Sequence, residues 1–134
     1  MELTGGVLAE SNQTNLISLT FDVTLAAGGD SVNLDPAATS NRTVIRYNDA
    51  SVTIHDMVYA ASAISGNTDL LLEAGELFEI TIDLTDATGT PPNTDAVITE
   101  NQIFTLEVQP PTGSYMVIQR TTPASIAHTV INLN

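Results

Sequence analysis

Two histidines, His55 and His128, are the side chains of this 134-residue chain best suited by type to acid–base chemistry. His55 is followed by Asp56, but neighbours on a strand point to opposite faces, so the two can act together only if a bulge turns one of them. His128 has no carboxylate near it in the sequence. We therefore interpret both histidines as solvated surface residues without a catalytic role.

Absent residue types remove further chemistry. The chain has no Cys, and because Arg42, Arg46 and Arg120 account for all three of its Lys and Arg residues, it has no Lys. Thiol nucleophiles, disulfides, zinc sites with Cys ligands, Schiff-base catalysis and phosphate-binding loops with a lysine are therefore excluded.

The sixteen acidic residues invite comparison with glycosidases, which use two carboxylates. Asp22, Glu79, Asp83 and Glu107, however, occupy the polar positions of segments in which polar and apolar residues alternate. Such positions form the solvated face of a sheet, which explains these charges without a reaction. The chain also has no Trp to serve as a sugar platform. We expect no catalytic residues and no enzymatic activity.

Two oxygen-rich turns could hold a hard cation such as Ca²⁺. Asp69, Glu73 and Glu76 surround the turn Gly66–Asp69, and a second group contains Asp30, Asn33 and Asp35. Neither group has the twelve-residue spacing of an EF-hand. The alternative interpretation is that these charges are simply solvated.

Two tripeptides match the acceptor motif for N-glycosylation. Asn12 opens Asn12-Gln13-Thr14 in a polar segment, and Asn41 opens Asn41-Arg42-Thr43 in a polar loop after Pro36. Both segments are expected to be exposed, as the modification requires. If the protein is secreted, we expect at least one of them to be used.

The charge balance limits the partners. The formal net charge is −13, so a phosphate backbone or an anionic membrane surface would repel the chain. No apolar run approaches the ~18 residues that a membrane span needs. We expect no nucleic-acid partner and no membrane contact of this domain.

Apolar and polar residues alternate repeatedly, with the period of two that is typical of half-buried strands. The predicted strands are residues 15–25, 31–35, 43–47, 51–59, 77–84, 103–108, 114–120 and 129–133, with a bulge near Asp56 in the fourth. Turn residues separate them, and no segment shows a sustained helical period. The pattern predicts an all-β fold, an antiparallel β-sandwich formed by residues 1–134 as a single domain.

Alternation also predicts which side chains form the core between the two sheets. The predicted core residues are Leu19, Phe21, Val23, Phe78, Ile80, Ile82, Phe104, Leu106 and Val108.

Several segments resemble the globular domain of archaeal flagellins, the archaellins. They are Ile17–Leu25 with the turn Ala27–Asp30, Glu73–Leu84, Leu106–Ser114, Arg120–Ala124 and Val130–Leu133. The most specific part is the combination of Thr121-Thr122-Pro123 with the turn Pro110-Pro111-Thr112-Gly113.

The resemblance implies an immunoglobulin-like sandwich that coats the archaellum, the extracellular swimming filament of archaea. Its partners would be other archaellin subunits in a helical filament, which it contacts laterally. In that family a long apolar N-terminal helix forms the filament core. We interpret residues 1–6 as a start placed within a longer gene product, so we expect that helix to be absent and the isolated domain to be monomeric.

The resemblance also bears on the candidate sites. Archaellins are often N-glycosylated, which favours Asn12 and Asn41. Some members carry a metal in an acidic loop before the strand that corresponds to residues 77–84, and here Asn67 and Asp69 are the evident ligands. Two alternatives remain: an envelope-anchored accessory or stator protein of the archaellum, and an adhesion or carbohydrate-binding domain of a surface protein.

Overall fold

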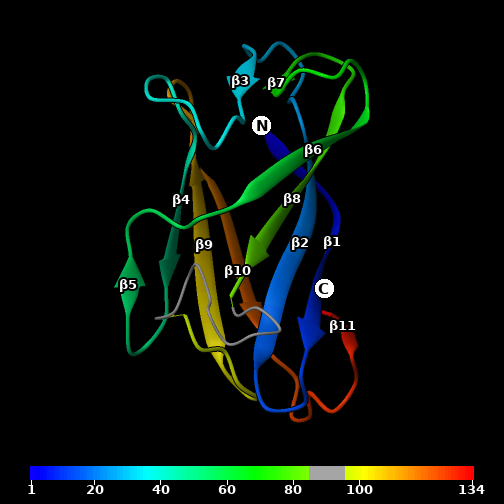
Figure 1. Ribbon diagram of the computed structural model, residues 1–134, viewed down its shortest axis with the longest axis vertical. Helices are drawn as coiled ribbons and strands as arrows, with labels where there is room; N and C mark the ends of the chain where they lie inside the picture. Colours follow the sequence, from blue (N-terminus) through cyan, green and yellow to red (C-terminus); the bar gives the residue numbers. More distant parts are fainter. Residues whose placement is uncertain (85–95) are drawn as a thin grey trace.

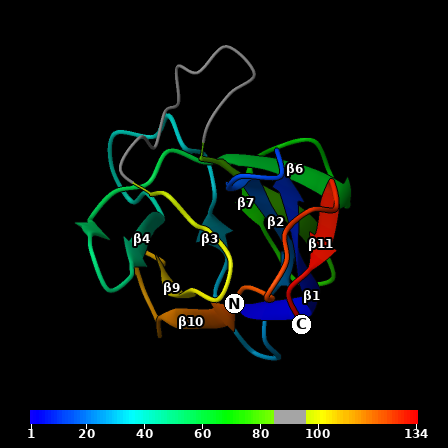
Figure 2. The same ribbon diagram turned by 90° about the horizontal axis from the view of Figure 1, so that it is seen from below.

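The computed structural model describes residues 1–84 and 96–134, which form two antiparallel sheets packed face to face (Figure 1). Seen from below, the two sheets lie beside each other as separate layers (Figure 2). The described residues include no helix that could span a membrane. The predicted immunoglobulin-like β-sandwich is confirmed.

Five strands form the larger sheet, in the order β11-β1-β2-β8-β6, and four form the smaller sheet, in the order β10-β9-β4-β5. Two short strands, β3 and β7, pair with each other at one end of the sandwich (Figure 1). The bounds are β1 Glu2–Ser11, β2 Leu16–Thr24, β3 Val32–Asn33, β4 Val44–Asn48, β5 Thr53–Ile54, β6 Ala60–Ser65, β7 Leu71–Leu72, β8 Leu77–Asp83, β9 Ile103–Gln109, β10 Met116–Thr121 and β11 Val130–Asn132.

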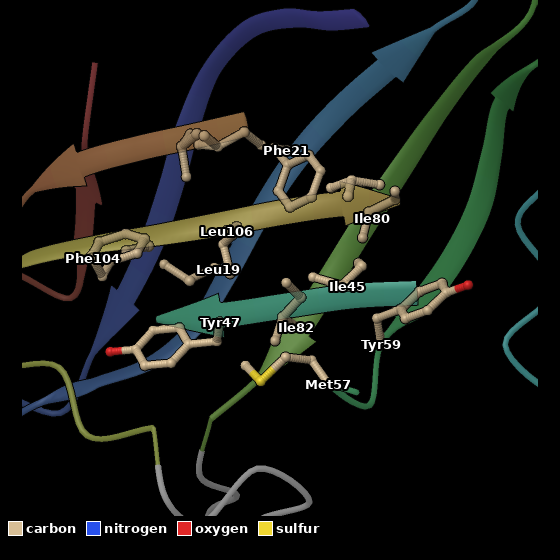
Figure 3. Close-up of a cluster of buried hydrophobic side chains, with 14 of the residues drawn as sticks. Leu19, Phe21, Ile45, Tyr47, Met57, Tyr59, Ile80, Ile82, Phe104 and Leu106 are labelled. Atoms are coloured by element: carbon tan, nitrogen blue, oxygen red, sulfur yellow. The ribbon is translucent and has the colours of Figure 1, made fainter. Parts of the chain in front are cut away.

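The core lies between the central strands of the two sheets (Figure 3). All nine predicted core residues are buried, with at most 1% of their surface exposed. In the larger sheet β2 and β8 pair in a register that sets Leu19 opposite Ile82 and Phe21 opposite Ile80. In the smaller sheet Tyr47 stacks on Phe104, with ring centroids 6.3 Å apart. The alternation seen in the sequence therefore marks the inner face of each sheet correctly.

Strand β1, Glu2–Ser11, is not among the strands predicted from the sequence, which begin at residue 15. Its middle contains Gly5, which has a φ of +73°, and the pairing with β2 shifts register between Thr4 and Leu8. This irregularity breaks the period of two, so the apolar pattern is lost where the strand passes through it. The strand nevertheless pairs with both β2 and β11.

The predicted strand 51–59 with a bulge near Asp56 is wrong. Only Thr53–Ile54 pairs with β4, and the chain then crosses to the other sheet, where residues 60–65 form β6. Hydrogen bonds hold this crossing, and among them the Met57 amide donates to the Ile45 carbonyl over 2.8 Å and the Tyr59 hydroxyl donates to the Thr43 carbonyl over 2.8 Å. Burial raises the pKa of Tyr59 to about 12. Met57 is buried because it fills the core at the crossing, and this explains why it is out of phase with β5.

A hydrogen-bond network around Asp49 closes the β4–β5 hairpin. The Tyr47 hydroxyl donates to Asp49, and so do the Ser51 and Val52 amides over 2.7 and 2.9 Å. Gln102 donates its side-chain amide over 3.0 Å and so ties the hairpin to the segment before β9. Partial burial of Asp49 opposes its ionisation, but these bonds outweigh it and lower its pKa. Burial, followed by the bond to Asp49, raises the pKa of Tyr47.

Candidate functional site

The loop that precedes β8 is organised around the side chain of Glu76. This carboxylate is buried, and it accepts the Asn67 amide on Oε1 and the Glu73 amide on Oε2, both over 2.9 Å. It therefore joins the two ends of the loop through charge-assisted hydrogen bonds, which are stronger than neutral ones.

Gly66 is required where this loop begins. Its φ is +129°, which side chains rarely adopt, and a Cβ added there would lie 2.4 Å from Oε1 of Glu76. Any other residue would therefore be strained and would push the buried carboxylate out of place.

Three carboxylates meet in this loop. Oxygen atoms of Asp69, Glu73 and Glu76 all lie within 4.8 Å of one another, and the first two side chains are exposed. Oxygens on opposite sides of a Ca²⁺ ion are about 4.8 Å apart, since each Ca–O distance is about 2.4 Å. The arrangement is thus compact enough to place three ligand oxygens around one cation.

The metal ligands expected from the sequence, Asn67 and Asp69, both belong to this loop. Asn67 donates its side-chain amide to Glu73 over 3.1 Å and accepts the Asp69 amide over 3.0 Å. Asp69 also accepts the amide of Leu71 over 3.0 Å. The structure thus brings Asp69 together with Glu73 and Glu76, the acidic group also named from the sequence, and it directs the side chain of Asn67 toward Glu73.

The second oxygen-rich turn is organised differently. Asn33 accepts the amide of Asp35 over 2.9 Å, and Asp35 accepts the amide of Ala37 over 2.9 Å. Within residues 1–84 and 96–134, neither Asp30 nor Asp35 belongs to a group of three converging ligands. These side chains shape the turn after β3.

The two glycosylation motifs differ in their accessibility. Asn12 and Thr14 are both exposed in the β1–β2 turn, where Asn12 Oδ1 accepts the Thr14 amide over 2.9 Å. Asn41 is exposed too, but Thr43 is fully buried and donates its hydroxyl to the Asn33 carbonyl over 2.7 Å. The folded chain therefore presents the whole motif at Asn12, but only part of it at Asn41.

The histidines and the strand carboxylates are positioned by separate elements of the fold. His55 and His128 are both exposed, and the carboxylate next to His55, on Asp56, pairs with Arg42 over 2.5 Å. The strand carboxylates considered above, Asp22, Glu79, Asp83 and Glu107, alternate with buried residues and face away from the core.

Comparisons with known proteins place the fold. The sequence model for archaeal-type flagellin matches residues 1–120. The crystal structure of archaeal flagellin FlaB1 from Methanocaldococcus jannaschii has a TM-score of 0.73 and 16% identity, over 96% of this chain and 93% of that chain. The archaeal flagellum of Methanospirillum hungatei strain JF1 has a TM-score of 0.65 and 21% identity, over 96% of this chain and 68% of that chain. No curated protein sequence matches significantly.

Sequence reasoning did not identify Glu76 as the centre of the loop, because its partners are two backbone amides that no sequence pattern reports.

We expect Glu76→Gln to lower the free energy of unfolding by about 1–3 kcal/mol, since an amide nitrogen would face a backbone donor in a buried position. Urea unfolding measures this. The matched control is Glu73→Gln, an exposed residue that keeps an oxygen for Asn67, with an expected change below about 0.5 kcal/mol. Equal losses in the two variants would contradict the assignment.

Proposed function

The chain belongs to the archaeal-type flagellin family, and from this premise we propose that its sandwich is the outer domain of the archaellum, forming the filament surface and the lateral contacts between subunits. The chain is a structural subunit of this extracellular filament, and its partners are other archaellin subunits. The match to the family over residues 1–120 carries this conclusion, because that range covers ten of the eleven strands in the described part of the chain wholly or nearly so. No comparison favours an accessory or stator protein, or an adhesion domain.

We further propose that the domain has no enzymatic activity and works through shape and surface. The sequence offers no Cys or Lys nucleophile, both histidines are exposed, and the carboxylate that follows His55, on Asp56, is paired with Arg42. The buried polar groups of Glu76 and Thr43 are used in hydrogen bonds that hold loops in place. A filament coat needs this stability and no reacting group.

The non-enzymatic proposal is tested in cells that produce only variant subunits. We expect His55→Ala and His128→Ala to give filaments and normal swimming, because neither imidazole has a reaction to perform. Ile80→Asp should abolish filaments, since it buries an unpaired charge in the core at a cost of several kcal/mol. Electron microscopy and motility assays give the two readouts. A histidine variant that keeps its fold and filaments but loses motility would contradict the proposal.

We propose that Asn12 is the main N-glycosylation site and that Asn41 is modified less. The modifying enzyme reads Asn together with the Thr two positions later. Thr14 is open to it in the folded domain, whereas Thr43 is buried and already bonded to Asn33. Modification at Asn41 would therefore have to precede folding or wait for local opening.

Mass spectrometry of subunits from archaeal cells tests this order of occupancy. We expect Asn12→Gln to remove most of the glycan mass and Asn41→Gln, the matched substitution, to remove much less. Predominant loss of mass in the Asn41 variant would show that accessibility in the folded state does not decide the site.

We propose that the loop of residues 66–76 binds a divalent cation such as Ca²⁺ through Asp69, with Asn67, Glu73 and Glu76 as neighbours. The support is chemical: the donor set is all oxygen, and two of the three carboxylates are exposed. The backbone bonds of Glu76 leave further lone pairs on its oxygens, because each carboxylate oxygen can accept more than one bond.

The cation proposal predicts that Ca²⁺ raises the melting temperature at constant ionic strength. Stabilisation from a specific site reaches about 2.7 kcal/mol when free Ca²⁺ is one hundred times the dissociation constant. Asp69→Asn should remove most of this increase, and Asp30→Asn, which removes the same charge outside the group, should not. Similar responses of the two variants would indicate general screening of the acidic surface.

A further inference from the structure

The two sheets of the sandwich carry very different charge. The strands of the larger sheet contain five carboxylates and no basic residue: Glu2, Glu10, Asp22, Glu79 and Asp83. The strands of the smaller sheet contain one carboxylate, Glu107, and two of the three arginines of the chain, Arg46 and Arg120. The strands of the larger sheet therefore carry a formal charge of −5, and the strands of the smaller sheet carry +1.

The outer side of the larger sheet is defined here as the acidic face. Each of its five carboxylates alternates with residues that point into the core, so all five are directed outward. Asp22 and Glu79 stand directly opposite each other on β2 and β8. Like charges in such a cross-strand pair destabilise a sheet, so this arrangement does not help the isolated domain to fold.

The outer side of the smaller sheet is defined here as the neutral face. Arg46 and Glu107 oppose each other on β4 and β9, and their nearest charged atoms are 3.8 Å apart, so their charges cancel. Three large apolar residues are exposed on this side or at its margin: Ile103, Tyr115 and Val117. Arg120 lies in phase with the buried residues Met116 and Ile118 on β10, so Arg46 and Glu107 are the charges that these strands direct outward. This balance of charge distinguishes the neutral face from the acidic face, whereas exposed apolar side chains occur on both sheets.

We propose that the neutral face of one subunit packs against the acidic face of a second copy of this chain; the inference rests on the proposed filament function. Two acidic faces would repel each other. Two neutral faces would form a two-fold contact, which closes a pair and cannot continue along a filament. A contact between two different faces leaves a free acidic face at one end of the resulting pair and a free neutral face at the other. Further subunits can therefore be added through the same contact.

The side chains available at such a contact are complementary. The guanidinium of Arg46 is loosely paired and more than a third exposed, so it can reach the carboxylates of a neighbouring acidic face. Val117 and Ile103 bring apolar surface that is otherwise left in water, and exposed Leu8 on β1 offers apolar surface on the opposing side. Close charge pairs of this kind select the partner and the orientation of an interface.

Cysteine cross-linking in filaments tests the proposal, because the natural sequence contains no Cys. Val117→Cys on the neutral face is combined in turn with Leu8→Cys, Thr20→Cys or Ser62→Cys, which sample three strands of the acidic face. The two faces point in opposite directions, so a short bismaleimide cannot join them within one copy. The control pair joins Val117→Cys with Val58→Cys, a residue of similar exposure on the crossing between the sheets.

We expect at least one face-to-face pair to give a ladder of multimers on a denaturing gel, while the control pair and each single variant stay monomeric. Dimers from Val117→Cys alone would indicate a two-fold contact and would overturn the proposal. Intact filaments without cross-links between the faces would overturn it too, while leaving the filament function standing. Failure of the unsubstituted subunit to form filaments would instead overturn the proposed function.

A charge insertion gives a second readout that does not depend on cross-linking. Val117→Glu would place a carboxylate against the acidic face, and we expect it to reduce filament yield at least tenfold while leaving the free domain folded. Val58→Glu adds the same charge, and we expect it to assemble normally. Val117 is 60% exposed and Val58 is 55% exposed, so neither change disturbs the core. Equal yields from the two variants would overturn the proposal.

Discussion

The interlocking of side chains between β2 and β8 on one side and β9 and β4 on the other is the constraint on which the structure depends. Leu19 and Phe21 meet Ile82 and Ile80 across one sheet, and the same layer faces Phe104 of the other sheet (Figure 3). Because the strand period is two, each buried residue assigns its neighbours to the outside. The residues on the two outer faces are thus a direct consequence of how the core is packed.

Polar groups near the core serve mainly to fix the connections between strands. Glu76 closes the loop before β8, and Asp49 closes the β4–β5 hairpin. Thr122 is buried, and its hydroxyl donates to the Thr99 carbonyl and accepts the Gln102 amide over 2.8 Å. These residues hold the ends of the sandwich together, and their function is architectural. A domain that coats a filament depends on this kind of bonding.

The sequence was sufficient to predict the central strands, the core and the antiparallel sandwich, because β2, β8 and β9 alternate without interruption. It was insufficient for β1, where Gly5 and a register shift break the period, and for β6, where the chain changes sheets after Met57. The acidic loop could be found from its residue types. The hydrogen bonds that Glu76 accepts from the backbone could not, because they depend on the folded path of the loop and leave no pattern in the sequence. The unequal charge of the two faces also required the strand order.

The core provides the stability of the domain, and we propose that its two outer faces direct assembly. A cryo-electron microscopy reconstruction of filaments built from this subunit tests it most directly. We expect a filament coated by sandwiches in which the acidic face around Asp22 and Glu79 lies against the neutral face around Arg46 and Val117 of the next copy. A filament whose neighbouring sandwiches meet only through strand edges or loops, with both faces open to solvent, would contradict it.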